Sequence, residues 1–203
     1  MKASPGKRSR PPATEPAAPA GGGADGTLLL CIDMQPVFLR AVADGPRVQR
    51  RCGFAIAAAT GLGLPVGFTE QVPQKLGGTT PELLALAPGA GVFGKNTFSA
   101  LGDDGIRDAL FDGRHVAHLL LCGIETSVCV YQTSLDALAA GRHVTILGDC
   151  VGARRPDDAR LCLEALIRAG AHVLPSETVF YALLHDVKHP FFKPYTELVK
   201  SHG

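Results

Sequence analysis

The chain of 203 residues carries little net charge and has no long apolar run. Its formal net charge is +1, so neither nucleic acid nor an anionic membrane surface is favoured as the main partner. A membrane-spanning helix needs roughly 20 consecutive apolar residues, and no run in this sequence approaches that length. A small molecule is therefore the expected binding partner.

Signatures of bound cofactors, metals and disulfides are also missing. The glycines form neither a G-x-G-x-x-G motif nor a P-loop, so no dinucleotide or nucleoside triphosphate is expected. The seven histidines are scattered without H-E-x-x-H or a paired His/Asp spacing, and the six cysteines include no C-x-x-C pair. The cysteine pattern and the absence of a convincing secretory segment indicate a reducing compartment. We therefore predict a cytoplasmic protein without a cofactor, a metal site or a disulfide framework.

The first 26 residues are rich in Pro, Ala and Gly and show no periodic apolar face. Such a segment cannot bury enough apolar surface to offset the entropy lost on ordering, which predicts a disordered tail over residues 1–26. Its basic residues Lys7, Arg8 and Arg10 would suit a targeting signal, but the interspersed prolines favour a plain solvated extension. Residues 27–203 are long enough for one domain with a sizeable core.

Strand-like and helix-like segments alternate along this domain without internal repeats. Short apolar runs predict strands, and apolar residues at helical spacing predict helices between them. This alternation predicts a three-layer α/β sandwich around a doubly wound, six-stranded parallel sheet. The expected strands are residues 27–33, 64–69, 89–94, 116–122, 143–149 and 171–174, and the expected helices are 46–62, 103–111, 126–140, 157–169 and 176–185.

Cys129 lies near the start of one of these helices, after a buried strand and a turn at Gly123. Thr126 or Ser127 is suited to cap the helix, which places Cys129 near its third position. Unpaired backbone N–H groups and the positive end of the helix dipole favour a thiolate there and offer donors to an oxyanion. The alternative is a cysteine that only packs in the core. We expect packing for the other five, which are Cys31, Cys52, Cys122, Cys150 and Cys162.

Two charged residues, Asp33 and Lys95, come at the ends of other expected strands. In an open parallel sheet the carboxyl ends of the strands form the edge where ligands bind. The topology therefore predicts that Asp33, Lys95 and Cys129 meet at this edge. The alternatives are that Asp33 caps the following loop and that Lys95 is a solvated surface charge.

A second carboxylate, Asp149, ends the fifth expected strand. Arg154 and Arg155 follow closely, and we favour a structural ion pair with them over a role at the ligand-binding edge. Ser176 is expected to cap the next helix.

Three motifs occur in order along the chain. They are Asp33-Met34-Gln35, the run from Lys95 to Ser99, and the run from Gly123 to Val130. Together they resemble the motifs of the isochorismatase-like cysteine hydrolases, a family that includes nicotinamidases and carbamoylsarcosine amidohydrolases, and the resemblance covers nearly everything after residue 26. Within the family, Thr69 to Leu83 and His189 to Lys193 resemble the branch of isochorismatase domain-containing proteins, which has no settled substrate.

The resemblance implies a metal-independent cysteine hydrolase acting on a small amide or related C–N bond. Cys129 would attack the carbonyl carbon to give a thioester, Asp33 would shuttle the proton, and Lys95 would hold both anions. Nicotinamidases carry a metal-binding D-x-H after the second strand, where this chain has Thr69 to Pro73. Two alternatives stay open: a catalytically silent interaction module, and a hydrolase of vinyl ethers such as isochorismate, which needs no thiol.

The same resemblance implies a cis peptide bond between Ile124 and Glu125. The backbone N–H groups of Glu125 and Cys129 would then form an oxyanion hole, and the Glu125 side chain would be a solvated or helix-starting carboxylate. Members of the family are commonly dimers or larger. We therefore expect a homo-oligomer, to which the apolar stretch Pro190 to Val199 contributes.

Overall fold

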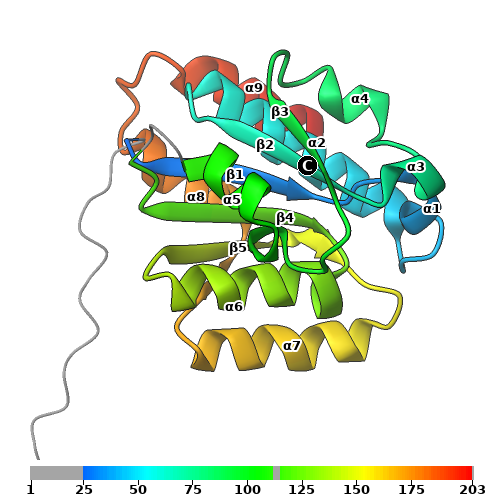
Figure 1. Ribbon diagram of the computed structural model, residues 1–203. Coiled ribbons are helices and arrows are strands. Elements are labelled where there is room, and N and C mark those ends of the chain that lie inside the picture. Colours follow the sequence, from blue (N-terminus) through cyan, green and yellow to red (C-terminus); the bar gives the residue numbers. More distant parts are fainter. Residues whose placement is uncertain (1–24, 112–114, 203) are drawn as a thin grey trace, which may run out of the picture.

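The computed structural model describes residues 25–111 and 115–202. They form a six-stranded sheet in which every pair of neighbouring strands is parallel, in the order β3-β2-β1-β4-β5-β6 (Figure 1). The doubly wound parallel sheet predicted from the sequence is confirmed. Its strands are β1 (Thr27–Ile32), β2 (Val66–Gln71), β3 (Gly91–Lys95), β4 (His118–Ile124), β5 (His143–Gly152) and β6 (His172–Leu174).

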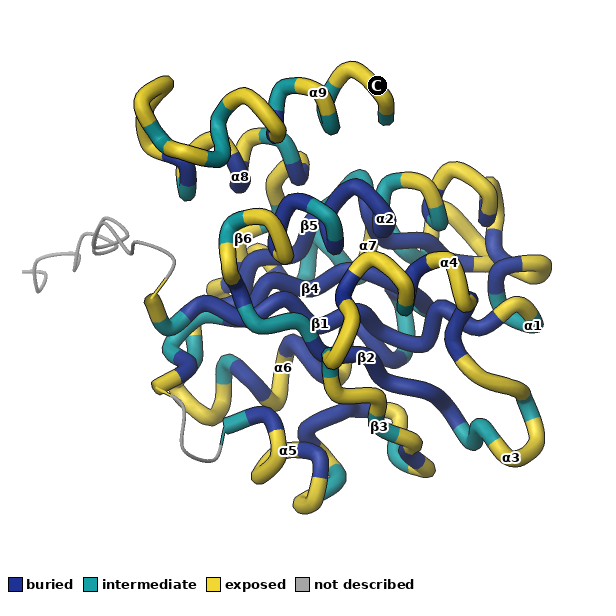
Figure 2. Tube along the Cα trace, turned by 90° about the horizontal axis from the view of Figure 1, so that it is seen from above, coloured by how far each residue is buried: buried dark blue, intermediate teal, exposed yellow. Residues whose placement is uncertain are grey.

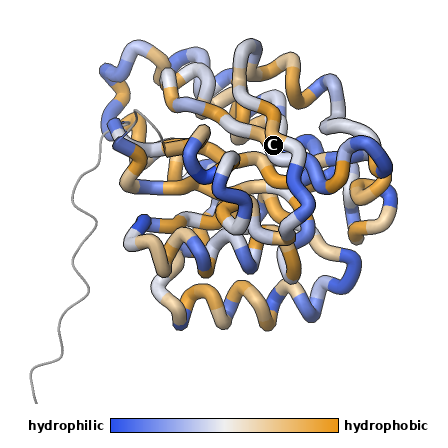
Figure 3. The backbone as a smooth tube through the Cα atoms, in the orientation of Figure 1, coloured by the Kyte–Doolittle hydropathy of each residue, from blue (hydrophilic) through white to orange (hydrophobic). Residues whose placement is uncertain are grey.

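Helices cover both faces of the sheet. On one face lie α2 (Gly45–Gly61), α8 (Ser176–Leu184) and α9 (Phe192–His202), and on the other lie α5 (Asp104–Phe111), α6 (Tyr131–Ala139) and α7 (Pro156–Arg168). Figure 2 shows β1 and β4 buried along nearly their whole length between these layers, and Figure 3 shows apolar residues gathered in the central strands. No helix among residues 25–111 and 115–202 has the length and hydropathy required to cross a membrane.

The two cores follow from the alternation of side chains along each strand. In β1, Leu29 and Cys31 join the core under α2, whereas Leu28, Leu30 and Ile32 join the core under α5, α6 and α7. Because successive side chains of a strand point to opposite faces, a continuous apolar run supplies both cores at once.

Short helical turns occupy the connections. They are α1 (Pro36–Leu39), α3 (Pro73–Leu76), α4 (Pro81–Leu84), the 3₁₀ turn η1 (Ala100–Gly102) and the π-helical turn η2 (Thr126–Val130). Each of α1, α3 and α4 begins with a proline, which suits the first helical position because its missing N–H has no intrahelical partner there. The segment expected as a long loop after β2 therefore contains two single-turn helices.

Four strands end later than the sequence predicts: β2 ends at Gln71, β3 at Lys95, β4 at Ile124 and β5 at Gly152. β2 begins at Val66, after Pro65, which has no N–H to contribute to the ladder. β5 continues beyond Asp149 to Gly152 because its pairing with β4 shifts register between Leu121 and Gly123.

Gly123 itself has no room for a side chain. It adopts φ 111°, and an added Cβ would lie 2.1 Å from the carbonyl oxygen of Ile32.

Asp149 does not pair with the arginines that follow it, so this prediction is wrong. Its Oδ2 lies 2.7 Å from Nη2 of Arg51 on α2, and it accepts hydrogen bonds from the N–H and the hydroxyl of Ser176, each at 2.7 Å. Arg154 and Arg155 pair instead with Glu125 and Asp158, because the longer β5 carries them past Asp149.

The expected capping of α8 by the Ser176 side chain is also not found. Pro175 precedes the first turn, and the Ser176 side chain donates to Asp149 rather than accepting from its own helix. Asp149 thus accepts hydrogen bonds from the first residue of α8 and pairs with Arg51 of α2, which links the two helices.

Replacing Asp149 with Asn is expected to destabilise the protein at neutral pH and much less in acid. Burial raises the pKa of Asp149, but the hydrogen bonds from Ser176 and Arg51 outweigh burial, and the net pKa is below its ordinary value. A carboxylate with a depressed folded-state pKa stabilises the fold above its unfolded-state pKa, about 3.9. That contribution is lost as pH falls through the folded-state pKa.

Urea unfolding at about pH 7 and about pH 2, with the exposed Asp136→Asn as control, measures this difference. An Asp149→Asn variant with the same loss of stability at both pH values contradicts the assignment.

Candidate active site

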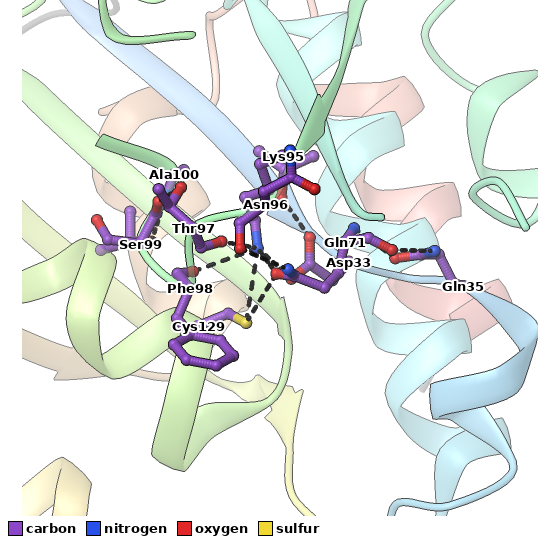
Figure 4. Close-up of polar contacts among 12 residues, drawn as sticks. Asp33, Gln35, Gln71, Lys95, Asn96, Thr97, Phe98, Ser99, Ala100 and Cys129 are labelled. Atoms are coloured by element: carbon purple, nitrogen blue, oxygen red, sulfur yellow. Dashed lines mark hydrogen bonds and ion pairs between the residues drawn. The ribbon is translucent and has the colours of Figure 1, made fainter. Parts of the chain in front are cut away.

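The structure brings Asp33, Lys95 and Cys129 together at the carboxyl edge of the sheet. Asp33 directly follows β1, Lys95 ends β3, and Cys129 lies in η2, just after β4. β1 and β4 are the neighbouring central strands from which the chain winds in opposite directions, the place where open α/β sheets bind ligands. The three residues are 1%, 2% and 7% exposed. Figure 4 shows their side chains pointing toward one another.

The Lys95 ammonium is the centre of the polar contacts. Its Nζ lies 2.7 Å from Asp33 Oδ2, 2.6 Å from Gln71 Oε1 and 3.6 Å from Cys129 Sγ. It also donates to the carbonyl oxygens of Thr97 and Phe98. A buried cation needs such acceptors, and these contacts satisfy its three protons. Lys95 is therefore not a solvated surface charge.

Asp33 is held through both carboxylate oxygens. Oδ1 accepts from the Thr69 hydroxyl at 2.7 Å, and Oδ2 accepts from Lys95. The residue adopts φ 51°, a left-handed conformation that aspartate tolerates better than most side chains. The conformation turns the chain out of the sheet at the point where the carboxylate meets the ammonium.

Cys129 occupies a π-helical turn rather than the third position of an α-helix. The Val130 N–H donates to the Glu125 carbonyl oxygen at 3.1 Å, a bond that spans five residues, and the α-helix begins only at Tyr131. The helix predicted from residue 126 therefore starts five residues later. Single π turns within helices are frequent at functional sites.

The position at the helix start does not by itself decide between thiol and thiolate, because the surroundings of Cys129 act against the anion. Burial raises the pKa of the Cys129 thiol to about 12, and the Asp33 carboxylate adds to the rise. The Lys95 charge and a backbone hydrogen bond from Glu125 act in the opposite direction without compensating. Cys129 is therefore a thiol at neutral pH.

The backbone and the side chain of Glu125 have different partners. The Ile124–Glu125 peptide bond is cis, and the Glu125 N–H is the backbone group that hydrogen-bonds to Cys129. The carboxylate accepts from the Arg154 N–H at 3.2 Å and from its Nε at 2.9 Å. The side chain is therefore paired with Arg154, not simply solvated.

The sequence reading assigned no role to two glutamines that complete the site. Gln71 ends β2 beside Lys95, and Gln35 binds the Gln71 backbone through both ends of its amide. Gln71 was missed because the expected strand stopped two residues earlier. The rule that residues at strand ends face the ligand edge would have identified it had the strand been placed correctly.

Three of the other cysteines also meet, although they are far apart in sequence. The sulfur atoms of Cys31, Cys52 and Cys122 lie within 4.8 Å of one another in the core between α2 and the sheet. The pKa values of all three thiols are raised, that of Cys52 chiefly by burial. Metal binding requires thiolates, so these neutral, buried thiols fit the packing role expected for them.

Comparisons with known proteins agree with the fold and the motifs. The isochorismatase domain profile matches residues 27–178. The secreted isochorismatase effector Isc1 of Phytophthora sojae is 34% identical over 179 residues, 87% of this chain and 85% of that protein. Isochorismatase domain-containing protein 2 of Xenopus laevis is 34% identical over 172 residues, 85% of this chain and 82% of that protein.

Among solved structures, the MAR1 ribonuclease from Caenorhabditis elegans has a TM-score of 0.82 and 31% sequence identity. The alignment covers 88% of this chain and 91% of that one. The profile match, the curated relatives and this fold together show that the chain belongs to the isochorismatase-like hydrolase family.

Proposed function

We propose that the protein is a metal-independent cysteine hydrolase that cleaves a small amide or related C–N bond through a thioester. One observation carries this proposal: a buried ammonium, Lys95 Nζ, lies 2.7 Å from the Asp33 carboxylate and 3.6 Å from the Cys129 sulfur. A nucleophile, a proton acceptor and a fixed positive charge are thus within reach of one bound carbonyl group.

The raised pKa of Cys129 determines how the first step proceeds. With a pKa of about 12, forming a free thiolate at pH 7 costs about 7 kcal/mol, at 1.36 kcal/mol per unit. The proton therefore passes from sulfur to Asp33 as sulfur bonds to the carbonyl carbon. Lys95 holds the Asp33 carboxylate in place to accept it.

The remaining steps use the same groups in reverse. The backbone N–H groups of Glu125 and Cys129 stabilise the oxyanion of the tetrahedral intermediate. As the C–N bond breaks, Asp33 returns its proton to the leaving amine, and a thioester remains on Cys129. Water then attacks the thioester with Asp33 as base, which releases the acid and restores the thiol.

The residues Thr69 to Pro73, at the end of β2, support chemistry without a metal. Their one carboxylate, Glu70, accepts from the Thr79 N–H at 2.7 Å and so anchors the following loop. The Gln71 amide oxygen is engaged with Lys95, and Pro73 offers no side-chain ligand. These residues do not fit the D-x-H metal site of nicotinamidases.

Hydrolysis of a vinyl ether is the second candidate, because the Phytophthora sojae relative is named an isochorismatase. The test is a panel of amides, ureides, isochorismate and a short RNA, the last because the Caenorhabditis elegans relative is named a ribonuclease. Thiol-dependent release of an amine supports the proposal. Cleavage of isochorismate that survives loss of Cys129 supports the vinyl-ether reaction, and no turnover of any compound supports a silent interaction module.

We also propose that the protein forms a homo-oligomer. Within Pro190 to Val199, Tyr195 lies in the protein's own core and Phe191 and Leu198 pack against it, so only part of this stretch is free to contribute to an interface. Among the exposed apolar side chains of the described residues, two lie on α7, where Leu161 is 55% and Ile167 53% exposed. Light scattering at micromolar concentration is expected to give a multiple of the monomer mass, reduced in Leu161→Glu. A monomeric wild type rejects the proposal.

A further inference from the structure

Gln71 takes no part in the reaction steps above, yet it touches two of the groups that do. It pairs in register with Lys95 on the neighbouring strand, so the two side chains lie side by side on one face of the sheet. Its Oε1 lies 2.6 Å from Lys95 Nζ and 3.9 Å from Cys129 Sγ. In Figure 4 the amide stands between Lys95 and Gln35. Gln71 is only 8% exposed.

The orientation of this side-chain amide follows from the partners at its two ends. Its Nε2 donates to the Asn96 carbonyl oxygen at 3.2 Å. Gln35 holds the main chain of Gln71, because it donates to the main-chain carbonyl oxygen at 3.1 Å and accepts from the main-chain N–H at 2.7 Å. A flipped amide would place an NH₂ group against the ammonium, donor against donor. The oxygen therefore faces Lys95.

The ammonium has fewer protons than acceptors around it. Two of its three N–H groups go to the nearest acceptors, Asp33 at 2.7 Å and Gln71 at 2.6 Å. The third is left for the weaker acceptors, which are the carbonyl oxygens of Thr97 and Phe98 and the Cys129 sulfur, at 3.3, 3.2 and 3.6 Å. The two short bonds fix the nitrogen and leave one N–H on the side of the sulfur.

We propose that Gln71 is a positioning residue whose amide oxygen holds the Lys95 ammonium between the Asp33 carboxylate and the Cys129 sulfur. The inference rests on the proposed function, because it assigns Gln71 to the same nucleophile. A neutral acceptor suits this place. The neutral amide oxygen stabilises the buried cation without adding a second negative charge beside the sulfur. The carboxylate of Asp33 already makes the thiolate form of Cys129 less stable.

The test measures the reactivity of Cys129 without any substrate. Iodoacetamide labelling of each cysteine is followed by mass spectrometry from about pH 7 to about pH 10, in wild type, Gln71→Met and Gln71→Glu. The charged groups that face the sulfur are Asp33 from β1 and Lys95 from β3. Gln71→Met removes the acceptor at similar volume, so the ammonium is no longer held beside the sulfur and the thiolate loses part of its stabilising contact. Labelling is expected to slow about tenfold, the effect of one pKa unit on the thiolate fraction.

Gln71→Glu keeps an acceptor but adds a charge near the sulfur, and it is expected to slow labelling more than Gln71→Met. The exposed Gln132→Met on α6 is the matched control, and labelling of Cys162 on α7 reports an intact fold. In the Asp33→Asn/Lys95→Met background no ammonium is left to hold, so adding Gln71→Met is expected to change nothing. With a substrate in hand, Gln71→Met is expected to lower kcat and leave KM unchanged.

Equal labelling of Cys129 in wild type and Gln71→Met overturns the proposal, and so does an effect of Gln71→Met that persists without Lys95. Either result leaves the hydrolase proposal intact. A Cys129 that reacts as expected while every substrate class fails overturns the hydrolase proposal alone. If Cys129 reacts too slowly to follow because of its raised pKa, the kcat values of wild type and Gln71→Met decide, and equal kcat values overturn the proposal.

Discussion

Replacing Cys129 with Ala is expected to abolish hydrolysis of whichever C–N substrate the panel identifies, with a loss in kcat of at least about 10⁴-fold. The sulfur is the atom that bonds to the carbonyl carbon, and among the described side chains that contact Lys95 Nζ only Cys129 carries a thiol. Cys129→Ser is expected to be nearly as inactive, because a hydroxyl loses its proton less readily than a thiol in the same buried place.

Two measurements separate this outcome from a general loss of folding. Cys162→Ala removes a half-buried thiol on the outer helix α7 and is expected to keep wild-type activity. Quenching the wild-type reaction and measuring intact mass is expected to show the acyl group on Cys129. Hydrolysis by Cys129→Ala at the wild-type rate would contradict the thiol mechanism.

Replacing Lys95 with Met is expected to destabilise the protein by about 3–5 kcal/mol, besides removing activity. The Lys95 and Asp33 side chains are 0% and 1% exposed, so the variant leaves a carboxylate buried without its counter-charge. Breaking such a pair costs more than the pair contributes, because the remaining group keeps its full desolvation penalty. Urea unfolding followed by circular dichroism measures the change.

The matched double variant tests the reason for this loss. Asp33→Asn/Lys95→Met removes both charges and is expected to recover much of the stability while remaining inactive. Lys200→Met breaks the exposed pair with Glu197, whose side chains are 70% and 71% exposed, and is expected to change stability by less than about 1 kcal/mol. A Lys95→Met variant as stable as Lys200→Met contradicts the buried ion pair.

The sequence was sufficient to predict the parallel sheet and the proximity of Asp33, Lys95 and Cys129. Runs such as Thr27–Ile32 and His118–Ile124 are apolar at every position that must be buried on both faces, so local composition alone marks them as parallel strands. Parallel strands share one carboxyl edge, and residues that follow them meet there whatever their separation in sequence. Strand ends were less well determined, since β2 and β5 depend on pairing with neighbours.

Only the tertiary structure decided the state and the partners of the charged groups. The pKa of Cys129 is set by burial and by Asp33, a residue almost a hundred positions earlier in the chain, and these outweigh the local helix start, which favours a thiolate. Asp149 likewise pairs with Arg51 across the α2–β5 contact rather than with its neighbours in sequence. The amide of Gln71 gains its place from the register of β2 with β3. Desolvation and hydrogen bonding act through space, so a sequence pattern that determines strands and their edge leaves these interactions undetermined.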